Sequence, residues 1–198
     1  ITISDNGGGE TRVAAAGYTP FDFSGNNYNA LTVSGLGGDD VIVLNSFGSS
    51  QTNDSPILLQ GDGGADAIQV QSTSGETGPI TLVGGTENDT FYLSDGVLPG
   101  SPQTAPGSAF NTGDVDNIAA VVSVFGENNP AGANALIAAR NNRLFVTDEA
   151  SAAGNLVGIT NSAINDILGV VAGPDVGFSN IDTLALFNPV ATWYGEGD

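Results

Sequence analysis

Apolar and polar residues alternate in three 14-residue segments, residues 31–44, 57–70 and 80–93, which align without gaps. Each segment predicts two short strands around a glycine-rich turn. If successive side chains of a strand point to opposite faces, one face of these strands takes twelve residues, all of them apolar. The other face takes twelve residues of which six are apolar. The glycines interrupt any helical period, so the pattern favours strands with a core on one side.

The spacing of the segments predicts how they are arranged. They begin at residues 31, 57 and 80, so the repeat lengths are 26 and 23 residues. These lengths suit one rung of a β-solenoid, in which equal positions stack at about 4.8 Å. We therefore predict an all-β fold, a right-handed parallel β-helix (β-solenoid) with irregular rungs and a long loop insertion. An antiparallel sandwich of the same strands is the alternative.

The length of 198 residues fits a single β-solenoid domain, residues 1–198. Residues 31–93 form the regular repeat block, the proline-rich residues 94–117 are a loop insertion, and residues 118–198 are degenerate rungs. Residues 191–198 match the first eight positions of the repeat, and residues 1–4 would supply the strand that follows. The sequence thus predicts either a part of a longer array or copies that stack head to tail by strand addition.

The turns of the three segments share a glycine at place one, an aspartate at place six and an apolar residue at place eight. The shared glycines and aspartates are Gly35, Gly61, Gly84, Asp40, Asp66 and Asp89. In these places the chain resembles the hemolysin-type (RTX-like) calcium-binding repeats, G-G-x-G-x-D-x-U-x, of large extracellular surface proteins. The resemblance covers about 27 of the 198 residues, and the motif occurs once per rung instead of in tandem. It implies calcium bound in the turns of a β-solenoid.

Electrostatics points to the same ion. Stacked Asp40, Asp66 and Asp89 would lie about 5 Å apart and repel one another by about 1 kcal/mol per pair in water. Carboxylates and turn carbonyls form an all-oxygen ligand set, which suits Ca²⁺ better than Mg²⁺. Ordinary solvated Gly-Asp turns without an ion are the alternative. The predicted cofactor is Ca²⁺, and the predicted metal ligands are Asp39, Asp40, Asp62, Asp66, Asn88 and Asp89.

The charge balance excludes several classes of partner. The chain has 22 acidic residues against three arginines, no histidine and no cysteine, and a net charge of −19. Nucleic acid is therefore not an expected partner, because phosphate binding requires cationic side chains. Zinc sites built from imidazole or thiolate are excluded as well. No apolar run approaches the ~20 residues of a membrane span, so membrane insertion is not expected. An acidic surface adapted to high salt would have the same composition.

We predict that the chain is not an enzyme. The carboxylate pairs Asp39–Asp40, Asp114/Asp116 and Asp148–Glu149 all fall in expected turns, where solvated acids are common. The expected function is an extracellular or cell-surface structural protein or repeat segment, such as part of an adhesin, matrix or surface filament. The alternatives are a polysaccharide-active enzyme on a β-helix, or a carbohydrate-binding module that stacks sugars on aromatic residues. Those aromatic residues are Tyr18, Tyr28, Tyr92, Trp193 and Tyr194.

Overall fold

The computed structural model contains strands and no helix within the residues that it describes. The described residues are 1–7, 10–24, 29–46, 55–73, 78–98, 113–126, 142–147, 158–159, 163–165, 174–179, 181, 183–187 and 194–195. Most of the predicted loop insertion, 94–117, lies outside them. The described part of the chain holds no helix long and apolar enough to cross a membrane.

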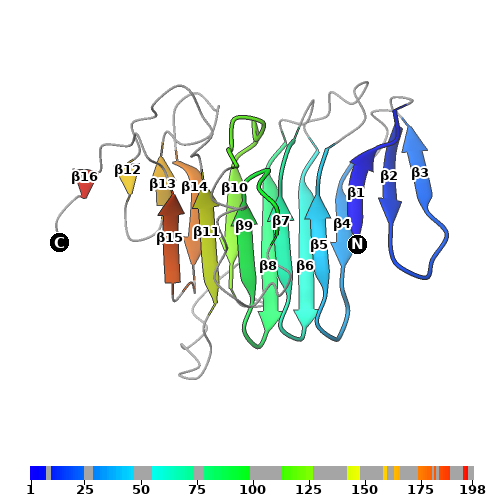
Figure 1. Cartoon of the computed structure of the whole chain (residues 1–198), viewed down its shortest axis with the longest axis horizontal. Coiled ribbons are helices and arrows are strands. Elements are labelled where there is room, and N and C mark those ends of the chain that lie inside the picture. Colours follow the sequence, from blue (N-terminus) through cyan, green and yellow to red (C-terminus); the bar gives the residue numbers. More distant parts are fainter. Residues whose placement is uncertain are drawn as a thin grey trace.

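The strands form two eight-stranded sheets (Figure 1). Sheet A contains, in spatial order, β15 (Thr183–Phe187), β11 (Arg143–Thr147), β9 (Thr90–Leu93), β7 (Ala67–Val70), β5 (Val41–Leu44), β1 (Thr2–Asp5), β2 (Glu10–Ala14) and β3 (Phe21–Ser24). Sheet B contains β16 (Tyr194–Gly195), β12 (Gly158–Ile159), β13 (Ala163–Asn165), β14 (Pro174–Ser179), β10 (Val122–Phe125), β8 (Ile80–Thr86), β6 (Ile57–Gly63) and β4 (Leu31–Ser34). From β4 to β11 the chain alternates between the sheets.

The three aligned segments stack in the register that their alignment predicts. Leu31, Ile57 and Ile80 pair with one another across β4, β6 and β8, and these strands are parallel. The second strands of the segments, β5, β7 and β9, are likewise parallel and in the aligned register. Strands β10 and β14 extend the parallel run in sheet B, and β11 and β15 extend it in sheet A.

The prediction of a right-handed parallel β-helix is wrong, although the all-β class is confirmed. The protein is a pair of sheets, and each sheet also holds antiparallel strands: β1–β2 and β2–β3 in sheet A, and β12–β13 and β13–β14 in sheet B. The physical reason is the length of the connections. Four residues separate β1 from β2, which is enough for a hairpin and too short for a crossover to a parallel neighbour.

The core lies between the two sheets. Eleven of the twelve predicted inward positions are buried, and the twelfth, Leu31, is half-buried and packs against the same cluster. Each fully buried Leu, Ile or Phe contributes about 1.5–3 kcal/mol of hydrophobic stabilisation. A second, smaller cluster joins Ala67, Tyr92 and Phe145, with the rings of Tyr92 and Phe145 stacked 5.5 Å apart. Tyr92 is therefore not exposed for sugar stacking.

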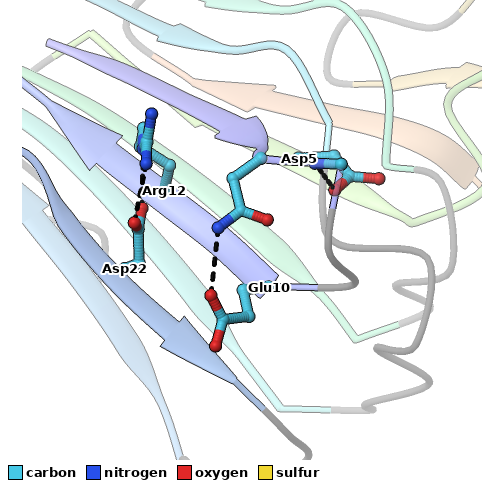
Figure 2. A network of polar contacts seen from close by, with 6 residues as sticks. Asp5, Glu10, Arg12 and Asp22 are labelled. Atoms are coloured by element: carbon cyan, nitrogen blue, oxygen red, sulfur yellow. Dashed lines mark hydrogen bonds and ion pairs between the residues drawn. The ribbon is translucent and has the colours of Figure 1, made fainter.

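The strands β1, β2 and β3 form an antiparallel extension at one end of sheet A (Figure 1). An ion pair joins β2 to β3: the guanidinium of Arg12 donates two hydrogen bonds of 2.7 Å to the carboxylate of Asp22 (Figure 2). The amide of Asn6 donates to the carboxylate of Glu10 at 3.0 Å. On its other edge β1 pairs in parallel with β5, so this extension is continuous with the repeats.

Candidate functional site

The predicted site residues lie in the turns that connect sheet B to sheet A. In each repeat the turn has positive φ at its second and fourth places, a backbone conformation that favours glycine. Three non-glycine residues adopt it nevertheless: Leu36 (φ 75), Asp62 (φ 71) and Glu87 (φ 80). The turns also bond to one another, because the N–H of Gly38 donates to the carbonyl of Gly63 at 2.7 Å. The glycines of the motif thus allow a sharp turn that stacks.

Three of the predicted residues form a continuous column of hydrogen bonds. Asp40, Asp66 and Asp89 directly precede β5, β7 and β9. The backbone N–H of Asp40 donates to Oδ1 of Asp66 at 2.8 Å, and the N–H of Asp66 donates to Oδ1 of Asp89 at 3.0 Å. The carboxylates of Asp66 and Asp89 therefore each accept a hydrogen bond from the preceding repeat, and these bonds connect successive repeats.

Sequence reasoning missed a fourth member of this column, Asn142. The N–H of Asp89 donates to Oδ1 of Asn142 at 2.9 Å, and the amide Nδ2 of Asn142 donates to the carbonyl of Gly126 at 2.9 Å. The signal was present, because Asn142 directly precedes β11 and Gly126 directly follows β10, as Gly35 follows β4. The separation of 53 positions between Asp89 and Asn142 hid it from a gapless alignment. We call Asp40, Asp66, Asp89 and Asn142 the side-chain ladder.

The second carboxylate oxygens of the ladder point toward the first glycine of their own turn. A methyl group on Gly61 would lie 2.1 Å from Oδ2 of Asp66, and one on Gly84 would lie 2.2 Å from Oδ2 of Asp89. Both distances are far below van der Waals contact. This close approach explains why glycine and aspartate occur together at places one and six of the motif.

Burial changes the protonation of Asp66. The side chains of Asp66 and Asp89 are fully buried. The pKa of Asp66 is raised to about 6, chiefly because burial disfavours the charged carboxylate; the hydrogen bond from the backbone of Asp40 lowers this pKa, and the negative charges of Asp40, Asp39 and Asp62 raise it. Within the described residues, Oδ2 of Asp66 has no hydrogen-bond partner. A buried carboxylate in this setting is costly when charged.

The remaining predicted ligands lie toward the outside of the turns. Asp39 is exposed, and its Oδ1 accepts a hydrogen bond of 2.9 Å from the N–H of Ala65 in the next repeat. Asp62 is half-buried and accepts a hydrogen bond from the hydroxyl of Ser34. Asn88 is exposed. The outer acids therefore also link neighbouring repeats, while they stay accessible to solvent.

The structure does not gather the predicted ligands into a chelating group. Among the described residues, no three side chains of the His, Cys, Asp or Glu types are placed to hold a metal ion. Calcium binding by the predicted ligands therefore stays a prediction. Asp39 and Asn88 are the exposed residues among them.

The other acidic cluster that the sequence singled out is held by its own backbone. Asp114 donates its N–H to Oδ1 of Asp95 at 2.9 Å and accepts from the N–H of Asp116 at 3.2 Å. Burial raises the pKa of Asp114, and the charge of Asp95 raises it further. The pair Asp148–Glu149 lies outside the described residues. Asp95, Asp114 and Asp116 thus stabilise a turn.

A groove of about 480 Å³ lies on the outer face of sheet B. Leu58 and Phe125 are among its apolar lining residues. Thr32, Leu58, Thr81 and Ser123 follow one another in a row across β4, β6, β8 and β10. Among the described residues, no acidic or basic side chain lines the groove, although the chain carries a net charge of −19. The lining residues are Ala30, Leu31, Thr32, Pro56, Ile57, Leu58, Thr81, Ser123 and Phe125.

Comparison with known proteins identifies no relative: no family model, no curated protein and no solved structure matches this chain.

Proposed function

We propose that this chain is a structural protein or repeat segment, a rigid β-scaffold of an extracellular adhesin, matrix or surface filament. The side-chain ladder carries the proposal. The aspartates that the sequence singles out connect successive repeats by hydrogen bonds, because Asp40 bonds to Asp66 and Asp66 bonds to Asp89. The structure adds Asn142, which accepts a hydrogen bond from Asp89. Side chains that form these hydrogen bonds stabilise the stack of strands, which is what a structural scaffold requires.

The extracellular location rests on the turn motif and on the charge. The glycine–aspartate turns resemble the RTX-like repeats of extracellular surface proteins. A net charge of −19 keeps copies soluble and apart in dilute solution. Extracellular calcium would bind the outer oxygens of Asp39, Asp62 and Asn88, shield their charges and stabilise the turns.

The location is tested by labelling cells of the source organism with an antibody against the folded chain. We expect labelling of intact cells, and loss of the label after brief protease treatment of those cells. Antibody against a cytosolic protein of the same organism provides the control. Labelling that requires permeabilised cells would contradict the proposal.

A second candidate function is the binding of a neutral carbohydrate in the groove on sheet B. The absence of charged residues among the lining residues favours a neutral ligand, and the hydroxyl groups of Thr32, Thr81 and Ser123 offer hydrogen bonds beside the ring of Phe125. An array of neutral and acidic glycans would test it. Binding that is lost in Phe125→Ala and kept in Val97→Ala, a change at an exposed apolar residue elsewhere, would support the candidate. An array without binding would exclude it.

A further inference from the structure

In the order of the described strands, the two sheets end at different places. The chain passes from sheet B to sheet A in five consecutive pairs, β4/β5, β6/β7, β8/β9, β10/β11 and β14/β15. At one end sheet A continues beyond β5 with β1, β2 and β3, while β4 is the last strand of sheet B. At the opposite end sheet B continues beyond β14 with β13, β12 and β16, while β15 is the last strand of sheet A (Figure 1).

We propose that copies of this chain join head to tail by fitting these two three-strand overhangs together. The overhang β1–β2–β3 of one copy would cover the overhang β13–β12–β16 of the next, so that both sheets continue without interruption. Strand β4 would pair with β16 of the neighbouring copy, and β3 with its β15. This inference rests on the proposed structural function and names the partner as a second copy.

Strand directions agree at both junctions. Strand β3 runs parallel to β1, because both are antiparallel to β2, and β1 is parallel to β5. Strand β16 is parallel to β12, which has the direction of β14 after two antiparallel steps. The parallel runs β5–β15 and β4–β14 fix the direction of the remaining strands. A copy moved along the stack therefore meets its neighbour with parallel strands at both edges.

Exposed aromatic surface marks the joint. Ile3, Val13 and Phe21 follow one another across β1, β2 and β3 and share one face of sheet A. Ile3 is fully buried and Val13 packs against the same core, whereas Phe21 is 65% exposed. At the other end of the molecule, Ile164 and Ile159 of β13 and β12 follow Val176 of β14 in register. The joint would cover Phe21 with this second overhang.

A contact of this kind is heterologous and open-ended. Each copy offers one surface and receives the other, so assembly propagates as a filament instead of closing into a dimer. Eight strands per sheet at about 4.8 Å give an axial rise of about 38 Å per copy. The net charge of −19 opposes association, so filaments should form more readily as salt screens it.

Two substitutions test the joint from its two edges. Phe21→Asp places a charge at the exposed aromatic residue. Thr32→Pro removes a backbone N–H at the open edge of β4. The N–H groups of Leu31 and Gly35 bond to β6, so the alternating N–H of Thr32 points away from it. The matched control is Val97→Asp, because Val97 is 66% exposed and lies outside both overhangs.

The purified full chain and the three variants are compared by sedimentation velocity and electron microscopy at about 0.02 and 0.5 M NaCl. Circular dichroism confirms that each variant is folded. We expect wild type and Val97→Asp to form filaments with a repeat of about 38 Å, and each edge variant to associate at least about tenfold more weakly. Monomers or closed dimers of wild type under both conditions would overturn the joint, as would filaments unchanged in both edge variants. Surface labelling of cells would then still stand, so the two proposals fail separately.

Discussion

Oδ2 of Asp66 lies 2.1 Å from the position that a methyl group on Gly61 would occupy. The Gly61→Ala substitution must therefore displace a buried carboxylate that belongs to the side-chain ladder. We expect a loss of about 3 kcal/mol or more in the free energy of unfolding, as for other overpacked core positions. Urea denaturation followed by circular dichroism would measure it.

Gly37 in the preceding turn provides the control for this substitution. A methyl group there would meet its nearest neighbour, the carbonyl oxygen of Gly63, at 3.9 Å, which is ordinary contact. Gly37→Ala should change the free energy of unfolding by less than about 1 kcal/mol. Equal effects of Gly37→Ala and Gly61→Ala would show that the carboxylate does not restrict Gly61.

The raised pKa of Asp66, about 6, predicts a pH dependence of stability. The carboxyl group of Asp66 loses its proton near pH 4 in the unfolded chain and near pH 6 in the folded protein. The free energy of unfolding therefore decreases as pH rises from about 4 to about 6, by at most about 3 kcal/mol, and this contribution stays constant above that range. Urea denaturation at several pH values between these limits would measure the trend.

Asp66→Asn isolates this contribution from those of the other acids. In the same ladder Asn142 donates its amide Nδ2 to the carbonyl of Gly126. An asparagine at position 66 would donate in the same way toward Gly61 and would carry no buried charge. We expect the variant to be more stable than wild type above pH 7 by about 1–3 kcal/mol, with a smaller pH dependence. A variant that is less stable than wild type above pH 7 would contradict the inference that the buried charge of Asp66 destabilises the folded protein.

Leu36 adopts φ 75 although its side chain is 76% exposed. The left-handed conformation costs a non-glycine residue about 1–2 kcal/mol, and little apolar contact repays it here. Leu36→Gly should therefore raise the free energy of unfolding by about 1 kcal/mol after the entropy cost of glycine. Leu36→Ala removes the same side chain and keeps the strain, so it should give no comparable gain. Thermal melts of the two variants would decide.

Calcium should raise the melting temperature if it binds the outer side of the turns, because an ion that binds only the folded state stabilises it by mass action. Thermal melts with Ca²⁺, with Mg²⁺ and with a chelator would measure the shift. The double substitution Asp39→Asn/Asp62→Asn should abolish it, whereas Asp22→Asn, which changes an acid paired with Arg12, should not. Identical midpoints with calcium and with chelator would remove the ion from the proposed function.

The repeat unit and its register could be read from the sequence, since the signal is local. Leu31, Ile57 and Ile80 hold equal places in three gapless segments, and the strands pair as these places predict. The alignment of Asp40, Asp66 and Asp89 in one column follows from the same register. Alternation of apolar and polar residues within each strand, together with a constant number of residues from strand to turn, is enough to predict the strand register and the aspartate column.

The rest could not be predicted because the gapless alignment does not cover it. The antiparallel strands β1 to β3 carry no copy of the repeat, so the alignment does not place them, and their hairpin follows only once the four-residue connection between β1 and β2 is known. The composition of the turns shows many acids, but not that Asp66 accepts its hydrogen bond from the backbone of Asp40. The column of carboxylates suggested that a cation balances their negative charge. In the structure, backbone N–H groups donate hydrogen bonds to the carboxylates of Asp66 and Asp89.

The side-chain ladder connects residues separated by 26, 23 and 53 positions with hydrogen bonds of 2.8–3.0 Å. Its geometry is therefore independent of how much chain lies between two of its members. Evolution, or a protein engineer, can lengthen the segment between Asp89 and Asn142 to display a foreign peptide, and the strands on either side would keep their spacing.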